Sequence, residues 1–450
     1  MTVVAGVDFG TASVRVSLFD DLHGRLGAGE AGYPVLRDDD GVGVRQRHAD
    51  HLAALETAFG VALANAGVDG HAVAALAVCT TGSTVVPLGD GLFPIDDYYL
   101  WCDHRARLEA EEITAAGAEL PALAFVGGRY SPEWGFAKVL HWLRHASPAL
   151  RAKVRTFAEH CDVIVATLIG ETEVERMPRS VCAMGHKWLW NERLGGLPSE
   201  AFLVSVDPLL AGVRAMLGGR YRDSGCLAGG LSPEWAARLG LLPGIPVPVG
   251  ALDAHWDAIG AGCRLGDVVN VIGTSSCIMA LSERCDPMLG IPGVVAGSID
   301  PHLVGIEAGL AACGDAFEAI ARRAGLSVAS LASELQSYRA GQTGLLRLVW
   351  DNGDRSVLGD TRLSGVTLGW RLGHSAADEL FAAIEGTAFQ TRIILDQLVG
   401  HGVEVARVIN GEAIVHDIRT SLWEDADLIA ASVLSLRLIG YLPNADRDCS

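Results

Sequence analysis

The sequence has no cysteine pair spaced as C-x-x-C and no G-x-x-x-x-G-K-[ST] run, so it carries neither a common zinc or redox motif nor a P-loop. Its N-terminus lacks a basic, apolar leader, and no apolar run approaches the length of a membrane-spanning helix. Positive charge is scarce, because 35 Lys and Arg stand against 54 Asp and Glu, a net charge of −19. This acidity argues against nucleic-acid and anionic-membrane partners. We therefore expect a soluble, cytoplasmic protein that binds neither.

What the chain does have is length and apolar content. Its 450 residues are enough for two or three domains, and a hydrophobic fraction of 50% allows a large core. The ten cysteines are scattered, which is typical of small core residues in a reducing compartment. Strand-like and helix-like segments alternate, and this order favours an α/β architecture.

Several segments carry a clear local signal. Apolar spacing predicts helices at 50–66 and 376–398 and a strand at 73–79. We also expect exposed, charged helices at 101–117 and 148–158.

Glycine and proline, which interrupt helices and strands, divide the rest of the chain. Residues 195–231 are rich in Gly and Pro, show no clear period and are expected to be a loop-rich passage. The segment 243–248, P-G-I-P-V-P, precedes a new strand and is the best candidate for a domain boundary. We therefore place a first lobe at 1–248 and a second at 249–450.

The first chemical motif lies near the N-terminus. An apolar strand candidate ends at Asp8, and Gly10, Thr11 and Ser13 precede a second apolar stretch. Glycine lets backbone N–H groups approach an anion, and hydroxyls add donors. The acid could hold Mg²⁺ through water. A plain glycine turn with a capping acid is the commoner reading of such a run, and it stays open on this motif alone.

A similar motif appears near the middle of the chain. The strand candidate 268–272 runs into Gly273, Thr274, Ser275 and a further serine. Two such turns, about half a chain apart, suggest two related lobes that close on a nucleotide.

Asp253 lies just before this second turn. It follows the apolar segment 246–249 and precedes a predicted helix, so it occupies a strand-to-helix junction. A carboxylate there can accept a proton from a hydroxyl group. It can equally cap the helix, and the two roles are compatible.

Together these residues resemble the FGGY carbohydrate kinases, and most closely their ribulokinase branch. The resemblance covers roughly residues 1–411. It also rests on five further segments in the family's order: L-W-C-D-H-R-A at 100–106, G-R-Y-S-P-E-W at 128–134, A-M-G-H-K-W-L-W at 183–190, G-I-E-A-G at 305–309 and N-G-D-R-S at 352–356. It implies an actin-like ATPase fold, also called ribonuclease H-like, in both lobes, with the active site in the cleft between them.

The expected reaction is transfer of the γ-phosphoryl group of ATP, with Mg²⁺, to a sugar hydroxyl. Asp253 is the candidate base, and Asp8 is the candidate acid on the metal side, acting on Mg²⁺ through water. The candidate nucleotide-binding residues are Asp8, Gly10, Thr11, Ser13, Gly273, Thr274, Ser275 and Gly411.

A sugar needs several directional polar groups. By resemblance, Lys187, Asp253 and Glu307 match positions that bind the ketopentose. Asp103 and His104 could add donors and acceptors, although Asp103 could instead be the N-cap of the 103–117 helix. Thr84 is a further candidate, with a core or turn role equally open.

The family pattern breaks after Asn410 and Gly411. Glu412 follows where the family has further glycines, and a truncation, a shift of reading frame or divergence would account for this. We expect intact phosphate and sugar sites with impaired nucleotide affinity. The leading function is phosphorylation of L-ribulose in arabinose catabolism. The alternatives are a D-ribulose or pentitol kinase, a catalytically impaired sugar-binding homologue and an actin-like chaperone; a homodimer is left open.

Overall fold

The computed structural model describes residues 3–20, 23–39 and 41–411. Its contacts divide the chain into two compact units. Unit 1 contains the chain up to Trp256 together with Val294–Val304, and unit 2 contains Asp257–Gly293 and the chain from Gly305 onward. The lobe boundary expected at residue 248 stays a prediction. Residues after Gly411, on which the expected break in the family pattern falls, lie outside the described part.

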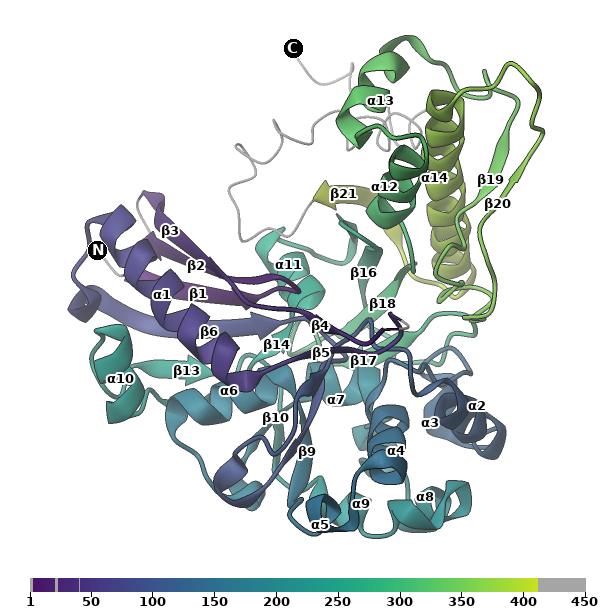
Figure 1. Ribbon diagram of the computed structural model, residues 1–450. Coiled ribbons are helices and arrows are strands. Elements are labelled where there is room, and N and C mark those ends of the chain that lie inside the picture. Colours follow the sequence, from purple (N-terminus) through teal and green to yellow (C-terminus); the bar gives the residue numbers. More distant parts are fainter. Residues whose placement is uncertain (1–2, 21–22, 40, 412–450) are drawn as a thin grey trace. The chain divides into compact units, whose positions relative to one another are not determined.

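The main sheet of unit 1 has the strand order β14-β6-β1-β2-β3 (Figure 1). β1 pairs antiparallel with β2 and parallel with β6, and β14 pairs parallel with β6. β1 and β2 form because valines and phenylalanines recur along them, with Val3, Val7, Val14 and Val16 buried. Their bounds are Val3–Phe9 for β1, Ser13–Asp20 for β2, Gly24–Gly32 for β3, Val73–Thr80 for β6 and Ala251–Leu252 for β14.

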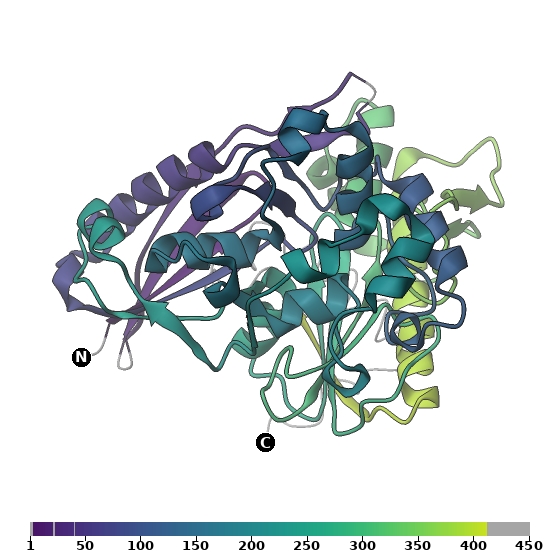
Figure 2. The same cartoon turned by 90° about the horizontal axis from the view of Figure 1, so that it is seen from below.

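Helix α1, His48–Ala66, packs on β2 and β3, as Figure 2 shows from below. Leu55 and Phe59 are buried on this face, which confirms the helix predicted at 50–66. Glycine on β3 permits the close approach, since a Cβ atom at Gly29 would lie 2.1 Å from the carbonyl oxygen of Ala58. Any side chain at Gly29 would therefore push the helix off the sheet.

A second sheet of unit 1 has the order β4-β5-β8-β7-β9. Its strands are β4 Leu36–Arg37, β5 Val44–Gln46, β7 Val85–Leu88, β8 Tyr98–Tyr99 and β9 Thr156–Glu159. Two further strand pairs are β10 Pro178–Ser180 with β11 Arg220–Arg222, and β12 Leu227–Gly230 with β13 Pro246–Pro248. The remaining α-helices that lie wholly in unit 1 are α2 Arg107–Ala116, α3 Pro121–Ala124, α4 Gly135–His145, α5 Pro148–Arg151, α6 His160–Ile169, α7 Val181–Lys187, α8 Glu200–Val206, α9 Val213–Met216 and α10 Pro233–Leu239.

Two expected helices are shorter than predicted, and a passage expected to be loop-rich contains some regular elements. The helix expected at 148–158 ends at Arg151, because Thr156–Glu159 pairs with β7 as strand β9. The helix expected at 101–117 begins at Arg107 with Ala106 as its N-cap, so Asp103 is not the capping residue. The passage 195–231, expected to be loop-rich, also contains the short elements α8, α9, β11 and β12. Pairing of β9 with β7 outweighed the composition of the first segment, and the carboxylate of Asp103 instead accepts from Val44 and Arg105.

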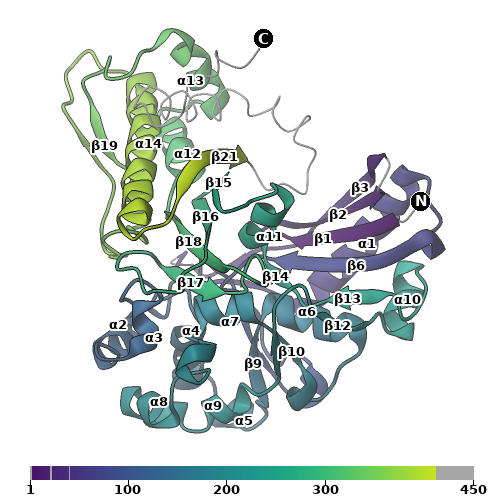
Figure 3. The same cartoon turned by 180° about the vertical axis from the view of Figure 1, so that it is seen from behind.

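The sheet that contains most of the strands of unit 2 has the order β17-β18-β16-β15-β21 (Figure 3). β15 pairs antiparallel with β16 and parallel with β21, which repeats the pairing of β1 with β2 and β6. The bounds are β15 Gly266–Ile272, β16 Ser276–Ser282, β17 Gly293–Ala296, β18 Val304–Leu310 and β21 Val405–Gly411. This repetition supports the expectation of two related lobes.

The long helix of unit 2 is α14, Ala376–Gly400, which confirms the helix predicted at 376–398. Its expected stripe is buried, from Leu380 and Ile384 to Leu395. The other elements are α12 Gly314–Arg323, α13 Val328–Glu334 and the hairpin of β19 Leu346–Leu348 with β20 Val366–Leu368. Helix α11, Asp253–Gly260, begins directly after β14. Within the described part of the chain, no helix is both long and apolar enough to cross a membrane, and no cysteine forms a disulfide.

Candidate functional site

Three parallel strands of unit 1 end level with one another. Phe9 of β1 pairs with Thr80 of β6, and Thr80 pairs with Leu252 of β14. The turn that begins at Gly10, the turn that begins at Thr81 and Asp253 therefore leave the same edge of the sheet. Ligands of α/β sheets bind at the carboxyl ends of parallel strands. The register thus brings the first predicted phosphate turn and the predicted base to one edge.

The turn between β1 and β2 is the hairpin that the sequence predicts. Gly10 donates its N–H to the carbonyl of Ser13 at 3.0 Å, and the hydroxyl of Tyr33 donates to the same carbonyl at 2.9 Å. The hydroxyl of Thr11 accepts a hydrogen bond from Nε1 of Trp101 at 2.9 Å, and the hydroxyl of Ser13 donates to Glu30 at 2.5 Å. The turn is thus held from several sides.

Asp8 lies at the end of β1 and is 2% exposed. Its Oδ2 accepts a hydrogen bond from Nε of Arg15 at 3.1 Å, and its Oδ1 faces Sγ of Cys79 at 3.6 Å. The carboxylate is therefore already neutralised by a cation of its own hairpin. This arrangement fits an acid that holds hydrated Mg²⁺ better than one that coordinates the ion directly.

The second turn lies in unit 2, between β15 and β16. Gly273 donates to the carbonyl of Ser275 at 2.8 Å, as Gly10 does to Ser13 in the first turn. The residue that sequence reasoning missed here is Arg355, whose Nη2 donates to the carbonyls of Ser276 at 2.7 Å and Leu310 at 3.0 Å. The N-G-D-R-S segment was the available signal, since a lone Arg beside Gly and Ser can brace a turn.

The other candidates of unit 2 lie on its sheet. Glu307 is a buried residue of β18, and Gly411 is the last residue of β21, in register with Val271 of β15. Next to Gly411, Asn410 accepts a hydrogen bond from the amide of Asn270 at 3.0 Å. Their predicted roles stay predictions.

Thr84 follows β6 and is fully buried. Its N–H donates to Oε2 of Glu159 at 3.1 Å, and its hydroxyl lies 3.0 Å from that of Thr81. Oε1 of Glu159 accepts from Nε1 of Trp188 at 2.8 Å. Burial raises the pKa of Glu159 to about 7 despite this hydrogen bond. The candidate sugar residue Thr84 is therefore fixed through its backbone by a buried acid.

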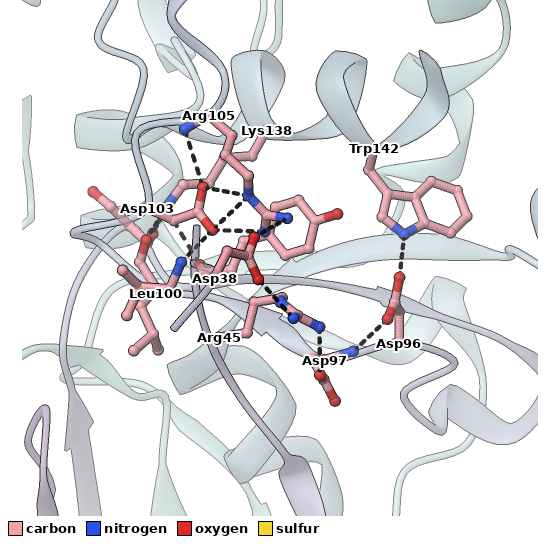
Figure 4. Close-up of polar contacts among 12 residues, drawn as sticks. Asp38, Arg45, Asp96, Asp97, Leu100, Asp103, Arg105, Lys138 and Trp142 are labelled. Atoms are coloured by element: carbon pink, nitrogen blue, oxygen red, sulfur yellow. Dashed lines mark hydrogen bonds and ion pairs between the residues drawn. The ribbon is translucent and has the colours of Figure 1, made fainter. Parts of the chain in front are cut away.

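The carboxylate of Asp103 is occupied by its own neighbours (Figure 4). Oδ2 accepts from the N–H of Val44 at 2.9 Å and from Nη2 of Arg105 at 2.6 Å. Arg105 also reaches Asp38, which in turn pairs with Arg45. This ionic cluster fixes the loop after β8. The same loop carries His104, whose Nε2 lies 3.2 Å from Oε1 of Glu133.

Lys138 of α4 is the second residue that sequence reasoning missed. It is 1% exposed, and its ammonium group donates to the carbonyls of Ser83 at 2.5 Å, Leu100 at 2.5 Å and Tyr99 at 3.3 Å (Figure 4). Burial lowers the pKa of Lys138 to about 8, although nearby carboxylates oppose this. The sequence contains only three lysines, so a lysine within an apolar helical segment was a usable signal.

Lys187 ends α7, which packs on β14 through a cluster that joins Cys182 and Ala183 to Leu252. Lys187 is buried, and its Nζ lies 5.8 Å from the ring centroid of Trp134. Neighbours of the two residues also meet, since the ring of His186, which precedes Lys187, lies 4.4 Å from the ring of His255, which is two residues after Asp253. Within unit 1 the structure therefore gathers the segment of Lys187 and that of Asp253. Gly273, Thr274, Ser275, Glu307 and Gly411 belong to unit 2.

Comparison with known proteins shows the family of the chain. The N-terminal domain of the FGGY family of carbohydrate kinases matches residues 3–184, and the C-terminal domain matches residues 268–410. A ribulokinase of Vibrio parahaemolyticus is 31% identical over 96% of this chain and 84% of its own length. A ribulokinase of Halalkalibacterium halodurans is 34% identical over 89% of this chain and 77% of its own length.

Solved structures share the fold at lower identity. A xylulose kinase from Rhodospirillum rubrum has a TM-score of 0.76 and 20% identity, covering 100% of this chain and 91% of the other. A Plasmodium falciparum glycerol kinase with ADP has a TM-score of 0.74 and 13% identity, covering 97% and 90%. With both domains matched in order, the chain belongs to the FGGY family of carbohydrate kinases, has their actin-like ATPase fold and is a sugar kinase.

Proposed function

We propose that this kinase phosphorylates a ketopentose, L-ribulose, at its 5-hydroxyl group, in arabinose catabolism in the cytoplasm. The observation that carries the proposal is the match to ribulokinases, at 31% and 34% identity, across both family domains. The products are ADP and L-ribulose 5-phosphate.

Asp253 is proposed to accept the proton of the attacking hydroxyl group. It is supported by its place at the N-terminus of α11, directly after the carboxyl end of β14. As the oxygen attacks the γ-phosphorus, the proton moves to the carboxylate and the bond to the β-phosphate oxygen breaks. The turns of Gly10, Thr11 and Ser13 and of Gly273, Thr274 and Ser275 are proposed to hold the phosphates, through donors other than the two glycine N–H groups and the Ser13 hydroxyl, which already donate within the protein.

The sugar is proposed to lie among Thr84, Asp103, His104, Lys187 and Glu307, with Asp253 at its reacting end. Lys187 and Glu307 are both buried, and groups of opposite charge can bind several hydroxyls at once. Asp103 contributes the ionic cluster that fixes the loop of His104. Hydroxyl recognition by buried polar groups discriminates strongly against analogues that lack a hydroxyl.

Asp8 is the proposed acid on the metal side. Mg²⁺, when bound with ATP, neutralises phosphate charge and orients the γ-phosphoryl group. The buried carboxylate of Asp8, already paired with Arg15, would hold this ion through its water ligands.

The test is ADP production from MgATP with L-ribulose, D-ribulose, D-xylulose, ribitol and glycerol, in the wild type and in Asp253→Asn. We expect turnover with L-ribulose above the other sugars and a loss of about 10²-fold or more in the variant. Calorimetric binding of L-ribulose to Asp253→Asn shows whether the sugar site survives. A preference for another sugar contradicts the substrate, and sugar binding without turnover in the wild type favours an impaired homologue.

A further inference from the structure

Unit 1 contains a buried group of rings with no part in the reaction proposed above. His51 lies on α1 and His160 begins α6, and each is 1% exposed. Their ring centroids are 4.6 Å apart, and Tyr98 stacks on His51 at 5.2 Å with an interplanar angle of 11°. Burying two imidazoles removes them from water, so each needs hydrogen-bond partners inside the protein.

Hydrogen bonds connect these histidines to the first phosphate turn. Nε2 of His160 lies 2.9 Å from Nδ1 of His51, and Nε2 of His51 lies 3.0 Å from Oε1 of Gln46. The amide nitrogen of Gln46 donates to the carbonyl of Thr11 at 2.7 Å. An unbroken line of side chains thus runs from the start of α6 to the turn.

The donors and acceptors along this line of hydrogen bonds can be assigned in only one way. The carbonyl of Thr11 can only accept, so the amide nitrogen of Gln46 faces it and the amide oxygen accepts from His51. Burial lowers the pKa of His51 to about 3 and that of His160 well below its usual value, so each ring is neutral with a single N–H. His51 uses its N–H on Gln46, and its Nδ1 must therefore accept from Nε2–H of His160. Nδ1 of His160 faces no acceptor among the described residues, so nothing there draws the proton away from Nε2.

We propose that His160, His51 and Gln46 are positioning residues that form a directed hydrogen-bond relay and fix the peptide of Thr11 in a single orientation toward the nucleotide phosphates. The relay rests on the proposed role of Gly10, Thr11 and Ser13 as a phosphate turn. Reversing any member would set two acceptors or two donors against each other, which destabilises a buried site.

The hydroxyl of Thr11 completes the arrangement. It accepts from Nε1 of Trp101 at 2.9 Å, so its own proton stays available to an anion. At the other end, the backbone N–H of His160 donates to the carbonyl of Thr84 at 2.9 Å. Because this last bond uses the backbone, side-chain changes at His160 should affect the phosphate turn and leave Thr84 in place.

The test compares three variants. His160→Leu removes the donor that sets the tautomer of His51, whereas His160→Gln keeps an N–H at a similar position and is the matched control. Gln46→Met removes the donor to Thr11 with little change in volume. Steady-state KM for MgATP and for L-ribulose are measured for each, with the unfolding midpoint and the affinity for MgADP by calorimetry.

We expect KM for MgATP to rise about tenfold in Gln46→Met and several-fold in His160→Leu, because a buried acceptor loses its donor. His160→Gln should stay within about twofold of the wild type, and KM for the sugar should not change in any variant. A purely structural role would lower the unfolding midpoint and the active fraction but leave KM unchanged.

Equal KM values for MgATP in His160→Leu and His160→Gln, or a wild-type value in Gln46→Met, would overturn the relay. If either Gln46→Met or His160→Leu fails to fold, the other decides. If the wild type phosphorylates none of the sugars, the proposed substrate fails, and the relay is then judged by MgADP affinity alone. That affinity should fall in Gln46→Met and in His160→Leu and be restored in His160→Gln; an unchanged affinity rejects the relay.

Discussion

Arg15 lies directly across the β1–β2 hairpin from Asp8, and its Nε donates to Oδ2 of that carboxylate at 3.1 Å. Asp8 and Arg15 therefore act together as one ion pair at the proposed Mg²⁺ site. Removing one partner of such a pair leaves a buried charge without compensation, whereas removing both does not.

A double-mutant cycle tests this ion pair. Arg15→Met and Asp8→Asn should each destabilise the protein, and the double variant should lose less than the sum, with a coupling of about 1–3 kcal/mol in the free energy of unfolding. Urea titration of the four proteins measures it. If the losses of the two single variants simply add, the interaction between Asp8 and Arg15 contributes nothing to the free energy of unfolding. The two single variants should differ in activity. If Asp8 holds Mg²⁺ through water, Asp8→Asn should lower kcat far more than Arg15→Met does.

Lys138 connects two loops that carry candidate sugar residues. Lys138→Met leaves the carbonyls of Ser83, Tyr99 and Leu100 without their donor, at a cost of about 1–3 kcal/mol in the free energy of unfolding. We expect KM for L-ribulose to rise and KM for MgATP to stay close to the wild-type value. Lys153 is an exposed lysine and gives the control variant Lys153→Met. A rise in both KM values would indicate a general loss of structure.

Arg355 braces the second predicted phosphate turn from within unit 2. Arg355→Met removes the donor to the carbonyls of Ser276 and Leu310. KM for MgATP should increase about tenfold, because the turn loses a charged hydrogen-bond donor. Arg362, which pairs with Asp360 at the surface, is the control, and Arg362→Met should behave as the wild type. KM for MgATP is measured from initial rates at varied MgATP concentration. Equal KM values in Arg355→Met and Arg362→Met would contradict the bracing role of Arg355.

Buried histidines make stability depend on pH. Burial lowers the pKa of His48 to about 4 and of His51 to about 3, from an ordinary 6.5. Between pH 4 and pH 6.5 these histidines bind more protons in the unfolded chain than in the folded one. Their contribution to the free energy of unfolding therefore falls as the pH is lowered from 6.5 toward 4. Each histidine contributes about 1.4 kcal/mol per pH unit.

His51→Gln should therefore lose less stability than the wild type over this range. Urea titrations near the two ends of the range measure the difference between the two slopes. Burial raises the pKa of Glu159 to about 7 and of Asp162 to about 6, which acts in the opposite sense. That contribution is common to both proteins and cancels in the comparison. Parallel slopes would mean that His51 is charged in the folded protein.

The sequence predicted those features that depend on local pattern. Glycine and hydroxyl residues between two apolar runs indicated both turns, and an acid before an amphipathic run placed Asp253 at the start of a helix. Features that depend on distant pairing were not predictable. The strand at Thr156–Glu159 exists because β7 pairs with it, and the carboxylate of Asp103 is occupied because Val44 lies beside it. The carbonyls that bind Lys138 have no sequence signature at all.

The alignment of Thr80 with Leu252 has a consequence for how the protein is made. The outer strand β14 joins β6 only after about 170 further residues have been synthesised, which takes roughly 10–35 s at ribosomal rates. During that interval the edge of β6 has no native partner, and an open strand edge invites pairing with other chains. The candidate base follows directly on β14, so the last strand to enter this sheet is also the one that delivers the reactive group.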